Sequence, residues 1–213
     1  MWNKLTIQQA QQIDLLRQSK DTTLEVETSI LAVINNVPQS EIDSLSWVDY
    51  LKQRNELTFL ETPPEGKPIE FVTIGKKRYR FIYDIRQMPF ARYIEGKTFS
   101  QSFMQNLHKL AASMVVPQKR TLFGWKDLKY DATKHEQYAE DMLNAPFEAV
   151  YSSAVFFYHL FRNWIEASKV YLIKEQMNRG MTMEEAVKLV TDLCLYLDGN
   201  IPLKPLQNIK ESA

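Results

Sequence analysis

The sequence predicts a mainly α-helical protein: a multi-helix bundle with a long central aromatic helix and one small β-hairpin. Helix-start signals, in which Ser or Thr is followed three residues later by Glu, Gln or Asp, recur along the chain. Glycine is scarce, with 6 among 213 residues. The hydrophobic residues keep a helical period until the proline-rich stretch 63–68, after which the period changes to two. These three observations favour helices joined by one β element.

Residues 1–62 are predicted to form an N-terminal helical subdomain. Thr6, Thr22 and Ser46 each begin a helix, because each is followed by a capping partner three residues later and by apolar residues at helical spacing. Residues 40–45 are predicted to form a short helical turn between the second and third of these helices. The two prolines that follow residue 62 end the subdomain.

Residues 63–86 are predicted to be a proline-rich linker and a β-hairpin. The segments 69–74 and 77–84 are rich in β-branched and aromatic residues. Between them lie Gly75 and Lys76, a two-residue turn whose first-position glycine suits type II′ geometry. An isolated hairpin is marginally stable in water, so this one must lie on helices or pair with other strands. The sequence predicts no third strand.

Residues 87–199 are predicted to form a helical bundle domain. Helices are expected over 89–96, 98–115 and 133–143 from their caps and their apolar spacing. The intervening segment 117–130 mixes basic and aromatic side chains. We expect this segment to be a loop that folds against the bundle, because its aromatic side chains need cover.

The longest helix is predicted to begin at Pro146 and to run to about Arg179, where Gly180 ends it. Its middle, residues 150–164, is apolar on nearly every side, which is typical of a helix surrounded by protein. We assign three of its aromatic side chains to the core: Phe157, Phe161 and Trp164.

One more helix and a tail complete the chain. Thr182, followed three residues later by Glu185, begins a helix that Gly199 ends. Residues 200–213 contain two prolines, and we expect them to form an extended or disordered tail unless a partner holds them.

The composition excludes several classes of function. Lys+Arg and Asp+Glu each number 26, so the chain lacks the basic excess of a non-specific nucleic-acid coat. The single cysteine, Cys194, cannot form an intramolecular disulfide, and one thiol with three histidines is too few for a zinc finger. No stretch reaches the length of about 20 apolar residues that a membrane-spanning helix needs. We expect an intracellular protein that binds neither membrane nor, as a rule, nucleic acid.

Motifs for catalysis and cofactor binding are incomplete. Residues 91–98 match a relaxed phosphate-binding loop, but no strand leads directly into them and they have a helical pattern. His135 begins a zinc-protease motif, but Ala139 occupies the position of the second histidine. Cys194 lies among apolar helix residues, and His159 is expected to be a hydrogen-bonded core histidine. We therefore expect no catalytic, metal or cofactor-binding residues and no enzyme.

The densest basic run lies on the predicted hairpin, where basic and aromatic residues alternate. Such an arrangement can contact phosphates and bases. Basic residues also protect the edge of a hairpin against aggregation, and we favour this second interpretation. The hairpin and the segment 117–130 together provide the candidate partner-binding residues: Arg78, Tyr79, Arg80, Phe123 and Trp125.

Four stretches of the chain carry a resemblance to a known family. They are residues 2–7 (WNKLTI); residues 75–79 (GKKRY) continuing through 83–86 (YDIR) to 91–94 (ARYI); residues 106–111 (NLHKLA) with 115–117 (VVP); and residues 139–146 (AEDMLNAP) with the aromatic helix after them. Taken together, they resemble the tail-assembly-chaperone-like proteins of tailed bacteriophages. The resemblance spans most of the chain.

This resemblance implies a non-enzymatic assembly protein of the host-cell cytoplasm. Its partners would be the long helical tape-measure protein, whose apolar seams it covers, and the tail-tube subunits that polymerise around that protein. Such binding uses aliphatic and aromatic surfaces, and the chain has 8 Met and 12% aromatic residues. The alternative is a structural virion protein, a head–tail or tail ring or connector subunit that reaches into neighbouring subunits. A homo-oligomer is compatible with both.

Overall fold

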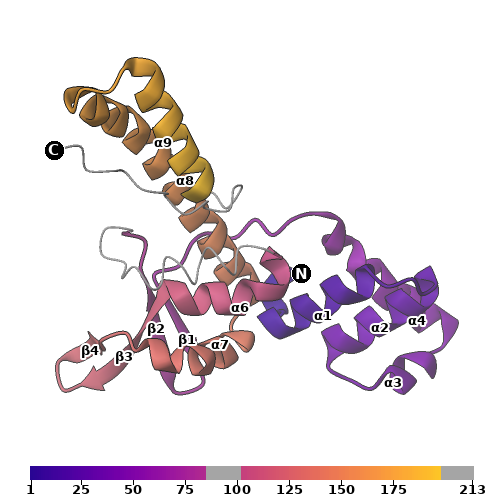
Figure 1. Ribbon diagram of the computed structural model, residues 1–213. Coiled ribbons are helices and arrows are strands. Elements are labelled where there is room, and N and C mark those ends of the chain that lie inside the picture. The colour runs from indigo at the N-terminus through magenta and orange to yellow at the C-terminus, as the bar shows by residue number, and fades with distance from the viewer. Residues whose placement is uncertain (85–101, 198–213) are drawn as a thin grey trace. The chain divides into compact units, whose positions relative to one another are not determined.

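The computed structural model describes residues 1–84 and 102–197 (Figure 1). These residues are mainly α-helical, as the sequence predicts, and they also form a four-stranded antiparallel sheet. The chain divides into two compact units, Met1–Phe157 (unit 1) and Tyr158–Ala213 (unit 2), which are described separately. The predicted segments 1–62 and 63–86 both lie within unit 1.

The predicted helix starts in residues 1–62 are confirmed. Thr6 and Thr22 each form a capping box with the residue three positions later, and the Ser46 hydroxyl accepts the N–H of Asp49. These caps satisfy N–H groups that have no partner inside the helix. The elements of this region are η1 (Trp2–Lys4), α1 (Ile7–Arg17), α2 (Thr23–Asn35), α3 (Gln39–Asp43), α4 (Trp47–Asn55) and η2 (Glu56–Glu61).

The N-terminal segment is bound to the start of the longest helix, α8 (Phe147–Asn178). The N–H of Ile7 donates to the carbonyl of Ala145 (3.0 Å), and the N–H of Phe147 donates to the carbonyl of Leu5 (2.8 Å). The rings of Trp2 and Phe147 pack with centroids 5.2 Å apart. The first and last helices of unit 1 therefore share one hydrophobic core.

The proline-rich linker lies directly on α8. The N–H of Ile69 donates to Ser153 Oγ (3.0 Å). A Cβ atom on Gly66 would lie 2.7 Å from Ser152 Oγ and 2.9 Å from Glu148 Cγ, so glycine permits this close approach. The linker thus positions the first strand of the sheet against the helix.

Four antiparallel strands form the sheet in the order β1 (Phe71–Ile74), β2 (Lys77–Phe81), β3 (Val115–Thr121) and β4 (Gly124–Asp127). The predicted hairpin is β1–β2, and Gly75 begins its turn with φ +58°. The prediction of no third strand is wrong, and so is the prediction that residues 117–130 form a loop, because most of a second hairpin lies there. The pattern was obscured because Pro117 interrupts β3 and because β4 has only four residues.

One face of the sheet packs on two helices, α6 (Phe103–Met114) and α7 (His135–Leu143). A short 3-10 helix, η4 (Ala132–Lys134), precedes α7. Tyr79, Phe81 and Val115 are buried on this face. The Tyr79 hydroxyl donates to Asp141 of α7, and Lys77 Nζ lies 2.7 Å from the same carboxylate. These contacts fix β2, which pairs with β1 on one side and β3 on the other, to α7.

A buried polar pair joins α6 and α7. His135 Nε2 lies 3.3 Å from Ser113 Oγ and 3.2 Å from the carbonyl oxygen of Lys109. Both side chains are buried, and Ser113 also donates to the Lys109 carbonyl. The pair therefore links two helices within the core and is closed to a substrate.

The predicted long helix and the predicted start of the final helix are confirmed, whereas the predicted end at Gly199 lies outside the described residues. α8 begins in unit 1 and continues into unit 2. Gly180, with φ +95°, follows its end, and α9 (Met183–Leu197) then folds back (Figure 1). Thr182 and Glu185 form the predicted capping box at the start of α9.

The aromatic middle of α8 is only partly enclosed. Phe157 is half-buried against the core of unit 1, whereas Tyr158 is exposed. His159, predicted to be a core histidine, is also exposed, because the packing of unit 1 ends two residues before it. Several predictions lie outside the described residues: the core positions of the Phe161 and Trp164 side chains, the side chain of Cys194, the helix 89–96, the segment 91–98 and the tail 200–213.

Candidate protein-binding surfaces

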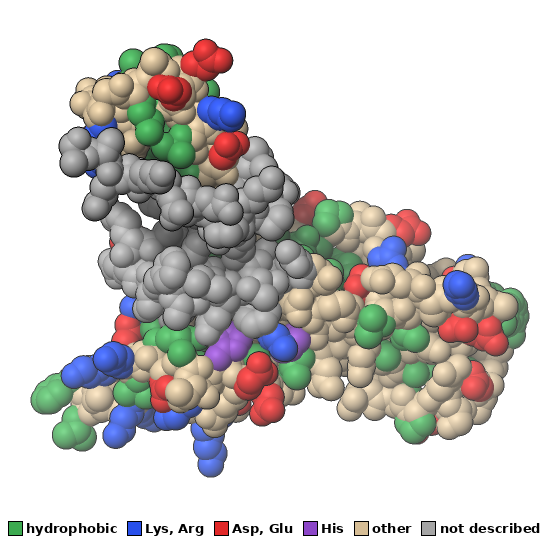
Figure 2. Space-filling model, in the orientation of Figure 1, with side chains coloured by type: hydrophobic (Ala, Val, Ile, Leu, Met, Phe, Trp, Pro, Cys, Tyr) green, Lys and Arg blue, Asp and Glu red, His purple; other side chains and the backbone are tan. Residues whose placement is uncertain are grey.

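The second hairpin ends in an exposed segment, residues 119–126, which we call the arm. All eight of its residues are exposed, and the two at its tip, Leu122 and Phe123, are 98% and 100% exposed. Figure 2 shows hydrophobic side chains at the end of this hairpin, with Lys and Arg side chains around them. Two adjacent large apolar residues without any cover are unusual on a protein surface, so the arm is a candidate contact site.

The turn at the tip is built by glycine. Thr121 pairs with Gly124 in the sheet, and its hydroxyl donates to the Gly124 carbonyl (2.9 Å). Gly124 adopts φ +122°, whereas neither Leu122 nor Phe123 has positive φ. This is the pattern of a hairpin loop closed by a glycine after the turn, and it directs the two apolar side chains outward.

The base of the arm is fixed by a polar network on the outer face of the sheet. Arg80 Nε donates to Asp127 Oδ2 (2.9 Å), and Gln118 Nε2 donates to Asp127 Oδ1 (2.8 Å). The hydrogen bond from Arg80 holds the pKa of Asp127 below its ordinary value. These bonds join β2, β3 and β4 side by side, so the arm extends from a braced sheet.

Arg78 lies between Trp125 of the arm and Phe71 of the first strand. Its guanidinium carbon lies 4.2 Å from the ring centroid of Phe71 and 5.3 Å from that of Trp125. Both distances are within the range of cation–π attraction. Trp125 is 41% exposed, so one part of its ring packs on the sheet and the rest is open to a partner.

The predicted partner-binding residues fall into two groups. Phe123 and Trp125 lie on the arm, and Arg78 and Arg80 lie half-buried on the same outer face of the sheet. Tyr79 does not belong with them, because it is 2% exposed on the inner face, where burial and its bond to Asp141 raise the pKa of its hydroxyl. Successive residues of a strand point to opposite faces, so Tyr79 cannot share a surface with its two neighbours.

Further large apolar side chains are exposed on α8 and α9 of unit 2 and in the turn between them. Eight large apolar residues there are 37–69% exposed; they are Val170, Tyr171, Met177, Met181, Met183, Val187, Leu189 and Leu193. Sequence reasoning recognised the apolar period of this last helix but proposed no contact there. We call these residues the α8–α9 surface.

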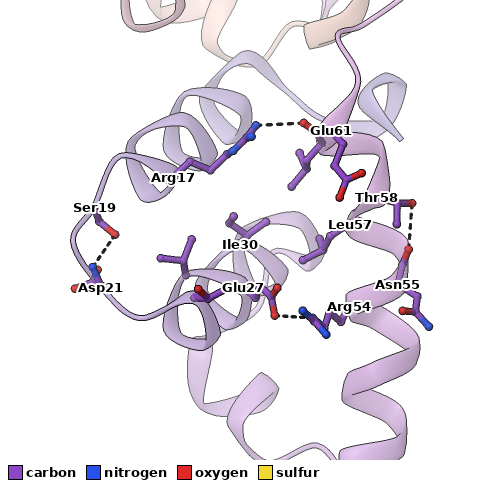
Figure 3. Close-up of a pocket in the computed structure, with 13 residues that line it drawn as sticks. Arg17, Ser19, Asp21, Glu27, Ile30, Arg54, Asn55, Leu57, Thr58 and Glu61 are labelled. Atoms are coloured by element: carbon purple, nitrogen blue, oxygen red, sulfur yellow. Dashed lines mark hydrogen bonds and ion pairs between the residues drawn. The ribbon is translucent and has the colours of Figure 1, made fainter.

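A cleft of about 460 Å³ lies between the α1–α2 connection and η2 (Figure 3). Its charged side chains mostly bind one another or the backbone: Arg54 Nε donates to Glu27 (2.7 Å), and Arg17 donates to the carbonyl of Leu60 (3.2 Å). Burial raises the pKa of Glu27, but hydrogen bonds from Arg54 and Tyr50 outweigh it and leave the pKa below its ordinary value. The carboxylate therefore serves the packing of α2 on α4 and is not poised as a general base.

Among the described residues, no group of three or more His, Cys, Asp or Glu side chains is placed to hold a metal ion. No helix in the described part of the chain is long and apolar enough to cross a membrane. Comparison of the chain with protein-family models, curated proteins and solved structures finds no match. The exposed apolar side chains of the arm and of the α8–α9 surface are therefore the basis of the proposed function.

Proposed function

We propose that the chain is a non-enzymatic assembly protein of tailed bacteriophages, a tail assembly chaperone that binds the tape-measure protein and tail-tube subunits. The α8–α9 surface is the observation that supports this proposal most strongly. It is apolar, it is carried by helices, and it is rich in methionine. These are the properties of surfaces that bind the apolar side of a partner helix.

The pattern on α9 indicates a missing neighbour. Ala186 and Val190 are buried and lie one turn apart on this helix. On either side of them lie exposed pairs at the same spacing: Met183 with Val187, and Leu189 with Leu193. The apolar stripe of α9 is thus wider than the strip that its contacts within the chain cover. A partner helix laid along either side of this strip would bury one of these pairs.

The methionines suit a long and irregular partner. Met177, Met181 and Met183 lie near the turn between the two helices and are 38–59% exposed. An unbranched thioether side chain adapts to different neighbours, so one surface can cover successive apolar patches of a long helix. A tape-measure protein offers such patches along its whole length.

The first experiment identifies the partner. The tagged full-length chain is purified from cells in which its phage replicates, and the co-purifying proteins and the finished particles are analysed by mass spectrometry. The proposal expects a very long helical partner and the absence of this chain from particles. If no such partner co-purifies, the proposal is wrong.

The second experiment locates the contact by titrating the purified partner against two variants. Leu189→Glu places a negative charge on the apolar stripe, whereas Lys188→Glu places one about 200° from both Ala186 and Val190, on the opposite side of the helix. Leu189→Glu should weaken binding at least about tenfold, which corresponds to about 1.4 kcal/mol, and Lys188→Glu should leave it nearly unchanged. Equal effects of the two variants would place the contact elsewhere.

A second candidate function is a structural virion protein, a tail or head–tail ring or connector subunit. The arm favours it, because a braced hairpin with an apolar tip is suited to reach into a neighbouring subunit. Stoichiometric presence of the chain in purified particles would support this function and contradict the chaperone.

A further inference from the structure

We infer that the arm of one copy binds the exposed start of α4 in a second copy, so that the chain associates with itself head to tail. The receiving site is the segment 41–49, which runs from α3 into α4 and which we call the α3–α4 segment. Both surfaces belong to unit 1. The inference is therefore independent of the α8–α9 surface and of the proposed chaperone function.

Both surfaces present large apolar side chains in pairs. The arm carries Leu122 and Phe123 at its tip, and the α3–α4 segment carries Trp47 and Val48, which are 66% and 61% exposed. Trp47 stacks on Tyr50 with ring centroids 5.6 Å apart, and Tyr50 is itself buried. The tryptophan is thus held in place and offers a flat apolar ring to the tip of an arm.

The charges of the two surfaces are opposite. Residues 119–126 contain three basic residues and no acidic one, and residues 41–49 contain three acidic residues and no basic one. Most of these charged side chains form no ion pair with any residue that the structure describes. They are Lys119, Arg120 and Lys126 of the arm, and Glu41 and Asp43 of the α3–α4 segment. Each surface therefore presents uncompensated charge of the opposite sign to the other. This favours contact between an arm and an α3–α4 segment over contact between two arms, which carry like charge.

The geometry of unit 1 makes the contact intermolecular. The arm and the α3–α4 segment lie at opposite ends of this unit (Figure 1). An arm therefore cannot reach the α3–α4 segment of its own unit. Two copies bound in this way leave one free arm and one free segment between them, so association proceeds to a ring or a chain of copies.

Neither surface has to be ordered on binding. Gly124 and the Asp127 network hold the arm, and the Ser46 cap holds the first turn of α4. Because ordering costs reduce affinity, two rigid partners with matched charge can associate through a small contact.

The test is sedimentation velocity of the full-length chain over a range of concentrations at low and high salt. The wild type should show a mass that increases with concentration, and the increase should be weaker at high salt. An arm variant (Leu122→Ser, Phe123→Ser) and a segment variant (Trp47→Ser, Val48→Ser) should each associate at least tenfold more weakly. A control variant (Leu15→Ser, Leu24→Ser), which removes two other exposed leucines of unit 1, should behave as the wild type.

Mixing the two defective variants gives the decisive result. The segment variant keeps its arm and the arm variant keeps its segment, so the mixture should form a 1:1 complex that does not grow further. A mixture that stays monomeric, or a segment variant that associates like the wild type, would overturn the inference. So would a wild-type chain that stays monomeric at every concentration, whether or not it binds anionic phospholipid vesicles or another protein. Leu189→Glu should leave self-association unchanged, which separates this result from that of the proposed function.

Discussion

The two hairpins of the sheet use their apolar side chains differently. β1–β2 buries Val72, Tyr79 and Phe81 on the face that covers α6 and α7, and its turn is polar. β3–β4 extends beyond the helices and carries Leu122 and Phe123 on its turn, fully open to solvent. Apolar burial explains why the first hairpin folds as it does, whereas the tip of the second contributes almost nothing to folding. Its apolar residues are therefore candidates for a contact outside the folded chain.

The sharpest test of this contrast compares the same substitution in both hairpins. Phe81→Ala should destabilise the protein by about 3–5 kcal/mol, because it removes a buried ring and leaves a cavity. Phe123→Ala should change the free energy of unfolding by less than about 0.5 kcal/mol, because the ring has no neighbours to lose. Urea unfolding measures both. A large loss of stability for Phe123→Ala would mean that the arm folds back onto the protein.

A second test concerns the polar contact that fixes β2 to α7. Tyr79→Phe removes the hydroxyl that donates to the Asp141 carboxylate, and we expect a loss of about 1.5–3 kcal/mol. Tyr83→Phe removes a bond to the backbone carbonyl of Ile69 instead and should cost only about 0.5–1.5 kcal/mol. Thermal or urea unfolding of the two variants gives the comparison. If Tyr79→Phe cost no more than its control, the inner face would be held by packing alone.

The helix starts could be predicted because their causes are local. Thr6, Thr22, Ser46 and Thr182 each bind an N–H only three residues away, so a short stretch of sequence contains both partners. The second hairpin could not be predicted in this way. β3 gains its partner β2 from a segment more than 30 residues earlier, and Pro117 hides its period.

The candidate surfaces were predicted only in part. The alternation on β2 separates Tyr79 from Arg78 and Arg80, but the sequence does not say which face lies inward. Phe123 and Trp125 were among the candidates, but the expectation that the bundle covers the aromatic side chains of this segment is wrong, because Phe123 is 100% exposed and Trp125 is 41% exposed. Trp47 and the α8–α9 surface were missed, because the exposure of an apolar residue in a helix depends on which elements pack against it.

A smaller effect is expected at the glycine that shapes the arm. Gly124→Ala places a Cβ at φ +122° and should destabilise the hairpin by about 1 kcal/mol. Hydrogen exchange should become faster in β3 and β4 while β1 and β2 keep their protection, since the strain is confined to the tip. The matched change at the end of α8, Gly180→Ala at φ +95°, should leave exchange in the sheet unchanged. Faster exchange in all four strands after Gly124→Ala would show that the two hairpins open as one unit.

The smallest effect concerns the carboxylate that braces the base of the arm. Arg80 holds the pKa of Asp127 below its ordinary value, so the charged form is stabilised in the folded state. This contribution is present above the ordinary carboxyl pKa and is lost as the pH falls through the lower pKa of the folded state. Asp127→Asn should therefore cost at most about 1 kcal/mol at pH 7, because the pair is partly exposed, and the difference from the wild type should shrink below about pH 4. In a protein that also carries Arg80→Gln, the effect of Asp127→Asn on the free energy of unfolding should no longer depend on pH. If it still does, Gln118 rather than Arg80 stabilises the charged carboxylate, and the arm is braced by its own strands instead of by the first hairpin.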